Sequence, residues 1–293
     1  MFKISGHLFI TDFYRLFKKV GLNSEVTNLF QKIIYEYYIK NKRKFPFREK
    51  ISPYNVLVSE IMLQQTQTRR VSEKFLKFIN TFPDFLSLSN ASFEEVLKQW
   101  KGLGYNRRAV ALKKIAEIVI NEHKGKLPDS LETLKSFPQI GHNTASSIVT
   151  FAFNKPTVFI ETNIRRVYIY FFFYNKSQIN DREILSIVEK TVDKINPREW
   201  YYALMDYGVM LKKTHPGLNK KSVHYRKQAP FKGSTRQTRG SILEILIKQG
   251  TIDIVNLQQT LKINDKKKIH YTLNQLEKEG FIEIKEEMIF LKK

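Results

Sequence analysis

Residues 57–67 read Leu-Val-Ser-Glu-Ile-Met-Leu-Gln-Gln-Thr-Gln, and together with residues 134–148 and 159–167 they decide the fold. The first stretch is apolar on nearly every side around Glu60, and a helix of that kind is normally buried. A buried carboxylate costs several kcal/mol unless a partner holds it. The stretch therefore predicts a buried helix whose single acid is either a satisfied core residue or a functional one.

The second stretch, residues 134–148, reads Leu-Lys-Ser-Phe-Pro-Gln-Ile-Gly-His-Asn-Thr-Ala-Ser-Ser-Ile. It predicts the end of one helix, a tight turn over residues 138–141, and a new helix that opens at residues 142–144. We expect Gly141 to supply the backbone freedom that the hairpin needs. The free N–H groups of the second helix could bind a phosphate, although an ordinary helical hairpin in a bundle explains the pattern as well.

The third stretch, residues 159–167, reads Phe-Ile-Glu-Thr-Asn-Ile-Arg-Arg-Val, an apolar run followed by a carboxylate and a helical pattern. Glu161, Thr162 and Asn163 lie at a predicted helix start, where acidic and amide groups cap free N–H donors. A capping role is the simplest interpretation, and it is compatible with a chemical role.

Together these stretches resemble the helix–hairpin–helix DNA glycosylase superfamily, specifically its MutY branch of adenine glycosylases. The resemblance runs from about Phe45 to Gly208, more than half of the chain. It is carried by five motifs in the order typical of the family: Phe45-Pro-Phe-Arg48, Ser59-Glu60 through Gln67, Gly102-Leu-Gly-Tyr-Asn-Arg-Arg108, the hairpin, and Met205-Asp-Tyr-Gly208.

The resemblance implies catalytic roles for three residues. Glu60 matches the glutamate that protonates the departing base and handles the attacking water, and the raised pKa of a partly buried carboxyl suits a proton donor. Glu161 falls where the family carries an aspartate that stabilises the sugar cation, and Asn163 matches a neighbouring asparagine. An acid at the leaving group and a carboxylate near the sugar are what an oxocarbenium-like transition state requires.

The resemblance also implies contacts with DNA. Gln65 and Tyr105 match residues that wedge into the duplex beside the extruded nucleotide, which must leave the stack before its glycosidic bond can be reached. The remaining residues expected to contact DNA are Arg48 and the hairpin residues Gly141, His142, Asn143 and Thr144.

Three departures from the family pattern bear on these roles. Glu161 is one methylene longer than the family aspartate, and active-site geometry tolerates only about half an ångström of displacement. Gln139 replaces the usual first glycine of the hairpin, where a phosphate or a monovalent cation would bind. Asn143 stands where bifunctional relatives such as endonuclease III carry a Schiff-base lysine, so imine-based strand cleavage from that position is not expected.

Composition favours a polyanionic partner. The chain has 50 Lys and Arg against 28 Asp and Glu, a formal net charge of +22. A genome of low GC content, which generally raises the proportion of lysine, would produce part of the same bias. We therefore expect double-stranded DNA with a mismatch or lesion as the partner, a monomeric protein, no membrane association, and a cytoplasmic location at the nucleoid.

The chain contains no cysteine, which excludes a disulfide framework, a zinc–cysteine site and an iron–sulfur cluster. Most of the MutY and endonuclease III branch carries a four-cysteine cluster after the catalytic region. Here residues 211–240 contain many cations and no acid. We interpret them as a segment that replaces the cluster region and contacts the DNA backbone, or as a flexible basic linker. His215 and His224 are too isolated to predict a metal site, so we expect no cofactor apart from a monovalent cation at the hairpin.

A chain of 293 residues suits more than one domain. We predict a mainly helical two-lobed core over residues 1–210, a basic connector over 211–236, and a small α+β domain over 237–293. The active site is expected in a cleft between two helical subdomains, one built mainly from residues 50–160. Apolar spacing predicts helices over residues 20–42, 84–97, 109–119, 181–195 and 198–210. Residues 1–11 show no signal-peptide pattern, and no apolar run is long enough to cross a membrane.

The last part of the chain predicts three helices, over residues 238–249, 252–261 and 265–279, and then a short hairpin. This pattern is typical of a winged helix, with Lys266, Lys267, Lys268 and His270 at the start of its third helix. It binds DNA or serves as a packing module, and it does not resemble the β domain that usually ends MutY and recognises 8-oxoguanine.

The sequence therefore predicts a monofunctional DNA glycosylase acting on adenine opposite 8-oxoguanine or guanine. A thymine or uracil glycosylase acting on guanine mismatches is the first alternative. A non-catalytic DNA-binding protein is the second, favoured by the glutamate at position 161.

Overall fold

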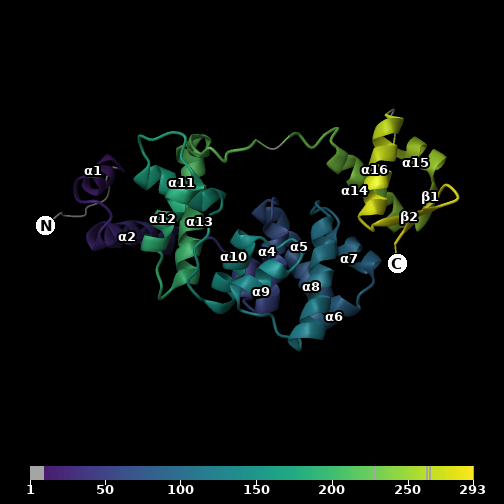
Figure 1. Ribbon diagram of the computed structural model, residues 1–293, viewed down its shortest axis with the longest axis horizontal. Helices are drawn as coiled ribbons and strands as arrows, with labels where there is room; N and C mark the ends of the chain where they lie inside the picture. Colours follow the sequence, from purple (N-terminus) through teal and green to yellow (C-terminus); the bar gives the residue numbers. More distant parts are fainter. Residues whose placement is uncertain (1–9, 228, 262, 264, 293) are drawn as a thin grey trace. The chain divides into compact units, whose positions relative to one another are not determined.

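The computed structural model describes residues 10–227, 229–261, 263 and 265–292 (Figure 1). It divides into two compact units, each drawn from separate stretches of the chain. The first unit comprises residues 1–53, 129–136 and 140–226, and the second comprises residues 54–128, 137–139 and 227–293. The expected subdomain over residues 50–160 is therefore shorter than predicted, because its first block ends at residue 128 and residues 140–160 fall in the first unit.

The first unit is helical. Its elements are α1 Ile10–Val20, α2 Ser24–Asn41, α3 Pro46–Glu49, α9 Leu131–Ser136, α10 His142–Phe153, α11 Thr162–Phe172, α12 Asp181–Thr191, α13 Pro197–Thr214 and the short 3₁₀ helix η1 Leu218–Lys221. The predicted helix over 181–195 ends early, because Val192 leaves the helix with an extended backbone. Helices α11 and α13 lie side by side and make the most extensive helix contact among the described residues (Figure 1).

Aromatic residues fill the core of this unit. The ring of Phe30, from α2, lies 5.1 Å from Phe171 and 5.0 Å from Phe172 of α11, centroid to centroid. The same ring lies 5.5 Å from Trp200 of α13. These edge-to-face pairs join three helices around one fully buried side chain. Tyr168, Phe171 and Phe172, from the same face of α11, are buried in this core.

The second unit begins with five helices: α4 Pro53–Leu63, α5 Thr68–Thr81, α6 Phe85–Asn90, α7 Phe93–Trp100 and α8 Arg107–His123. Residues 84–97 form two helices in place of the single predicted one. The reason is local, because Asp84 and Ser92 each cap a helix start through a capping box and so begin two separate helices.

The rest of the second unit is α14 Thr235–Gln249, β1 Thr251–Asp253, α15 Ile254–Leu261, α16 Lys266–Lys278, β2 Ile282–Lys285 and β3 Met288–Leu291. The strands form an antiparallel sheet in the order β1-β3-β2. Strand β1 was predicted as the start of a helix, and it is a strand because Ile252 pairs with Ile289 of β3, far along the sequence. The protein is thus mainly helical with a small C-terminal sheet, and the winged-helix assignment stays a prediction.

No helix in the described part of the chain is long and apolar enough to cross a membrane. The prediction that residues 1–11 show no signal-peptide pattern concerns mainly residues 1–9, which lie outside the described residues.

Arg108, at the start of α8, organises the loops of the second unit. Its guanidinium donates to the carbonyl oxygens of Ile61 and Met62 at 2.8 Å and of Gln64 at 2.6 Å, at the end of α4. It also donates to Leu103 O at 3.2 Å and Gly104 O at 2.9 Å, in the turn before α8. A cation at a helix C-terminus satisfies carbonyls that have no partner within the helix.

The arginine is only 4% exposed, and burial lowers its pKa to about 10. It therefore remains a cation at neutral pH and holds two loops together from inside the unit.

We expect Arg108→Met to lower the free energy of unfolding by about 3 kcal/mol or more, because several buried carbonyls lose their donor. Urea denaturation followed by circular dichroism measures this. Lys114→Met, at an exposed position on the same helix, is the matched control and is expected to stay within about 0.5 kcal/mol of wild type. Equal stability of the two variants would contradict the role of Arg108.

Candidate functional site

The predicted wedge residues Gln65 and Tyr105 have an unusual backbone. Their φ angles are +52° and +48°, in the left-handed region that residues other than glycine rarely adopt. The loops that carry them are bound by the same guanidinium of Arg108, which reaches Gln64 O on one side and Gly104 O on the other. Strained backbone of this kind persists where its surroundings fix it, and it clusters at functional sites.

Glu60 lies in α4, one residue before the carbonyls that Arg108 holds. Its neighbours Ser59 and Ile61 are buried, whereas Glu60 itself is partly exposed. The predicted buried helix is present, and the role of Glu60 stays a prediction.

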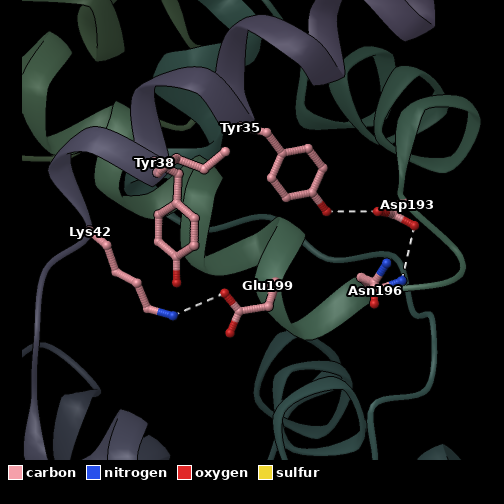
Figure 2. Close-up of a pocket in the computed structure, with 7 residues that line it drawn as sticks. Tyr35, Tyr38, Lys42, Asp193, Asn196 and Glu199 are labelled. Carbon is pink, nitrogen blue, oxygen red and sulfur yellow. Dashed lines mark hydrogen bonds and ion pairs between the residues drawn. The ribbon is translucent and has the colours of Figure 1, made fainter.

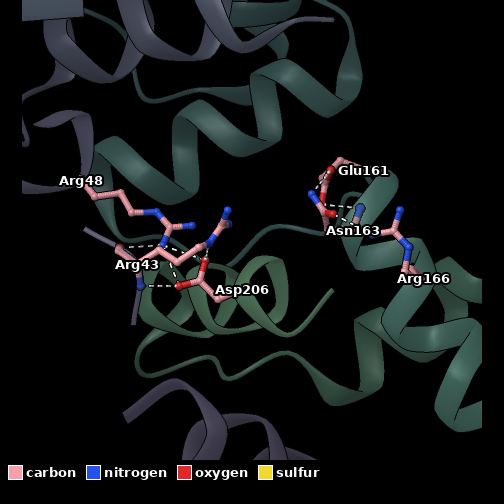
Figure 3. Close-up of polar contacts among 6 residues, drawn as sticks. All are labelled: Arg43, Arg48, Glu161, Asn163, Arg166 and Asp206. Atoms are coloured by element: carbon pink, nitrogen blue, oxygen red, sulfur yellow. Dashed lines mark hydrogen bonds and ion pairs between the residues drawn. The ribbon is translucent and has the colours of Figure 1, made fainter. Parts of the chain in front are cut away.

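Glu161 and Asn163 come together in the first unit (Figure 3). Glu161 is the N-cap of α11, and its carboxylate accepts the backbone N–H of Asn163 at 2.7 Å and of Ile164 at 2.9 Å. The amide of Asn163 donates to the second carboxylate oxygen at 3.2 Å. The predicted helix start is confirmed, and one oxygen of Glu161 is committed to the cap.

Arg166 fixes the orientation of Asn163. Its guanidinium donates to Asn163 Oδ1 at 2.8 Å and to the carbonyl of Gly208 at 2.7 Å. Arg166 is 6% exposed and was not among the predicted site residues, although an arginine inside an apolar helix was a usable signal. The amide of Asn163 is thereby presented with a defined orientation.

Gly208, from the last family motif, allows this arrangement. A Cβ placed on Gly208 would lie 2.4 Å from the backbone oxygen of Asn163 and 2.7 Å from its Cβ. A glycine is therefore required for α13 to approach the start of α11.

The side chain of Arg48, predicted to contact DNA, is 6% exposed in the first unit. Its guanidinium lies 3.0 Å from Asp206 Oδ1 (Figure 3). It also lies over the ring of Tyr202, 4.4 Å from the centroid. Asp206, 2% exposed, also accepts from Arg43 Nε at 2.7 Å. Arg48 thus has a structural role, and a contact with DNA stays a prediction. The signal for Asp206 was an acid within the apolar run of residues 200–211.

The hairpin residues lie at the start of α10, as predicted, and Gly141, His142 and Asn143 are exposed. The expectation for Gly141 is wrong, because its φ is −88°, which any residue can adopt. The left-handed position is Gln139, with a φ of +62°, where the family usually has glycine. The backbone of the turn is therefore strained at Gln139, because a residue with a side chain adopts the left-handed conformation there.

Figure 2 shows a separate hollow of about 380 Å³ in the first unit, lined by α2 and the start of α13. Tyr35 donates to Asp193 at 2.7 Å, and Lys42 lies 3.2 Å from Glu199. Lys42 and Glu199 form an ion pair, Asp193 is bound by the Tyr35 hydroxyl, and the hollow contains none of the predicted site residues. In the described part of the chain no group of three or more His, Asp or Glu side chains is arranged to hold a metal ion.

Comparison with known proteins agrees with this geometry. Residues 58–194 match the family model described as "HhH-GPD superfamily base excision DNA repair protein". The chain is 34% identical over 195 residues to an adenine DNA glycosylase of Buchnera aphidicola, which covers 65% of this chain and 55% of the relative. It is 31% identical over 207 residues to the human adenine DNA glycosylase, covering 67% and 37%.

Two solved structures share the fold. A thermostable thymine-DNA glycosylase matches with a TM-score of 0.59 and 25% identity, over 68% of this chain and 96% of that one. An endonuclease III–DNA covalent intermediate matches with a TM-score of 0.51 and 18% identity, over 72% and 91%.

This chain therefore belongs to the helix–hairpin–helix glycosylase superfamily. Within it, the chain belongs to the MutY-like branch, whose curated members named above are adenine DNA glycosylases. It spans about half the length, or less, of those relatives.

We expect Gly208→Ala to lower the free energy of unfolding by about 1–3 kcal/mol, because the new methyl group would push Asn163 away. Gly240→Ala is the matched control: Gly240 lies inside α14 with no atom of another element within 4 Å of an added Cβ. There alanine should stabilise by about 0.5–1 kcal/mol. Thermal unfolding measures both, and a stabilised Gly208 variant would contradict the close approach.

Burial raises the pKa of Glu161 above its ordinary value of 4.5, and the N–H bonds from Ile164 and Asn163 only partly oppose the shift. A raised native pKa contributes stability below pH 4.5 that is lost as pH rises through that pKa. Wild type should therefore lose stability relative to Glu161→Gln as the pH rises above 4.5.

Glu183→Gln provides the control of opposite sign, measured by denaturation over the same pH range. A hydrogen bond from the Lys176 ammonium lowers the pKa of the partly exposed Glu183, so wild type should gain stability relative to that variant as pH rises through the acid range. A pH-independent difference for Glu161→Gln would refute the burial effect.

Proposed function

We propose that this protein is a monofunctional DNA glycosylase that hydrolyses the N-glycosidic bond of a flipped-out base, with adenine opposite 8-oxoguanine or guanine as its substrate. The observation that carries the proposal is the Glu161–Asn163 pair, a carboxylate and an amide held rigidly at the start of α11. Both lie within residues 58–194, the range that matches the family model.

In the proposed reaction Glu60 donates a proton to the departing base. The electron pair of the glycosidic bond leaves with that base, and the sugar passes through an oxocarbenium-like state. The carboxylate of Glu161 stabilises the positive charge on the sugar. Water then attacks the anomeric carbon and returns its proton to Glu60, so that water is the only co-reactant.

The proposed partner is duplex DNA with a mismatch or lesion. A formal charge of +22 favours a polyanion, and Gln65 and Tyr105, held with left-handed backbones, are the proposed wedges. The exposed start of α10 and the basic residues 211–236 are the proposed contacts with phosphates. Asn143 provides no amine, so no lyase step is proposed from that position.

The proposal is tested by base release from duplexes that carry adenine opposite 8-oxoguanine or guanine, and thymine or uracil opposite guanine. Strand breaks on the adenine duplexes only after alkali are expected. Breaks on the thymine or uracil duplexes alone would support the second candidate, which the similarity to a thymine-DNA glycosylase favours. Tight binding without release from any duplex would support a non-catalytic DNA-binding protein.

Glu60→Gln should abolish base release in single-turnover assays, a loss of at least about 100-fold, because the leaving base is no longer protonated. Its dissociation constant for the duplex should stay near that of wild type. Glu73→Gln, on the exposed face of α5, is the control and should release the base at the wild-type rate. Activity retained by Glu60→Gln would make Glu60 a structural residue.

A further inference from the structure

The C-terminal part of the second unit contacts the turn that carries Tyr105. A groove of about 1020 Å³ is lined by residues 64–67, residues 101–108, and side chains of α14 and α16. All these segments belong to the second unit. The two predicted wedge residues therefore share one groove with a domain that is not part of the matched family region, residues 58–194.

Arg236, in the first turn of α14, binds the wedge tyrosine directly. Its guanidinium donates to the phenol oxygen of Tyr105 at 2.7 Å and lies 5.7 Å from the centroid of the same ring. A second nitrogen donates to the carbonyl of Ala229 at 2.7 Å. The arginine is thus anchored to its own segment while it holds the ring of Tyr105.

Ionic contacts also join the C-terminal part of the second unit to the turn that carries Tyr105. Glu279, at the end of α16, accepts a bidentate contact from Arg239 at 3.1 and 2.6 Å. The same carboxylate accepts from Arg107 Nε at 2.7 Å, and Arg107 is two residues after Tyr105. Lys101, before the turn, lies 2.7 Å from Glu244 of α14. Cations on both sides of the Tyr105 turn are therefore bound to acids of the C-terminal domain.

The turn needs such support because of its backbone. Gly102, Gly104 and Tyr105 all have positive φ, of +91°, +71° and +48°. Glycine adopts this conformation freely, whereas at Tyr105 it is strained. Arg108 holds the carbonyls of the turn from the inside and lies 5.4 Å from the centroid of the Tyr105 ring. Arg236 adds a hydrogen bond to the phenol oxygen from the C-terminal part of the unit.

We propose that Arg236 is a positioning residue for Tyr105, and that the C-terminal domain orients the wedge for insertion into the duplex. This inference rests on the proposed function, since the wedge matters only if a nucleotide is extruded. The domain then acts through Tyr105 in base extrusion, in contrast to a module that adds affinity by contacting phosphates on its own.

The two roles make different predictions. A phosphate contact contributes to affinity and to its salt dependence, whatever residue occupies position 105. A positioning contact changes the extrusion step, and its effect disappears once the phenol oxygen is removed.

The experiment compares Arg236→Gln, Tyr105→Phe, the double variant and the conservative Arg236→Lys, all in the full-length protein. Lys278→Gln is the control, because Lys278 is an exposed cation of the same domain that does not line the groove. Extrusion is followed by the fluorescence of 2-aminopurine placed beside the target adenine. Binding to the same duplex, single-turnover base release, and hydrogen exchange of residues 102–108 complete the set.

We expect Arg236→Gln to slow extrusion and base release by about tenfold, with the dissociation constant changed by less than about threefold. The same substitution should have little further effect in the Tyr105→Phe background, and Arg236→Lys should restore part of the rate. Hydrogen exchange in residues 102–108 should be faster in Arg236→Gln than in Lys278→Gln.

Two results would overturn the inference. One is extrusion by Arg236→Gln at the rate of Lys278→Gln, and the other is an equal effect of the substitution with tyrosine or phenylalanine at position 105. If wild type releases no base from any duplex, the proposed function fails. Hydrogen exchange then still decides whether Arg236 restrains the turn, so that the two failures are distinguishable.

Discussion

The buried guanidinium of Arg108 is the interaction on which the geometry of the second unit depends. It binds the carbonyls that end α4 and those of the turn before α8, so two loops distant in sequence have one common anchor. Glu60 lies just before the first set, and Tyr105 just after Gly104. Because the cation is desolvated, each lost bond leaves a buried carbonyl without a donor, and the loops are held with little freedom.

In the first unit a different arginine holds the candidate residues in place. Arg166 joins Asn163 of α11 to the carbonyl of Gly208 in α13, and Glu161 caps the same helix. Burial of Glu161 opposes its ionisation, while the N–H groups at the start of α11 favour it. Preorganised groups of this kind stabilise developing charge without having to reorganise during the reaction. Both units thus present their candidate residues on rigid helix ends.

The sequence predicted most helices because their apolar spacing and capping residues are local properties. It failed where a distant partner decides the conformation. Strand β1 exists because Ile252 pairs with Ile289, which lies far along the sequence. The left-handed residue of the hairpin is Gln139 and not the glycine at 141, since the path of the chain fixes φ there against local preference.

By itself the sequence determined the helical class, the order of the motifs, the candidate residues Glu60, Glu161 and Asn163, and the absence of any cysteine ligand. The helical class follows from residue types and spacing within single elements, and the three candidate residues follow from the resemblance to the family. Only the tertiary structure decided that Arg108 joins the two predicted wedge loops, that Arg166 reaches the carbonyl of Gly208, and that Arg236 reaches Tyr105. Each of these is a hydrogen bond between residues whose separation along the chain no local pattern encodes, and it forms only when packing brings donor and acceptor within about 3 Å.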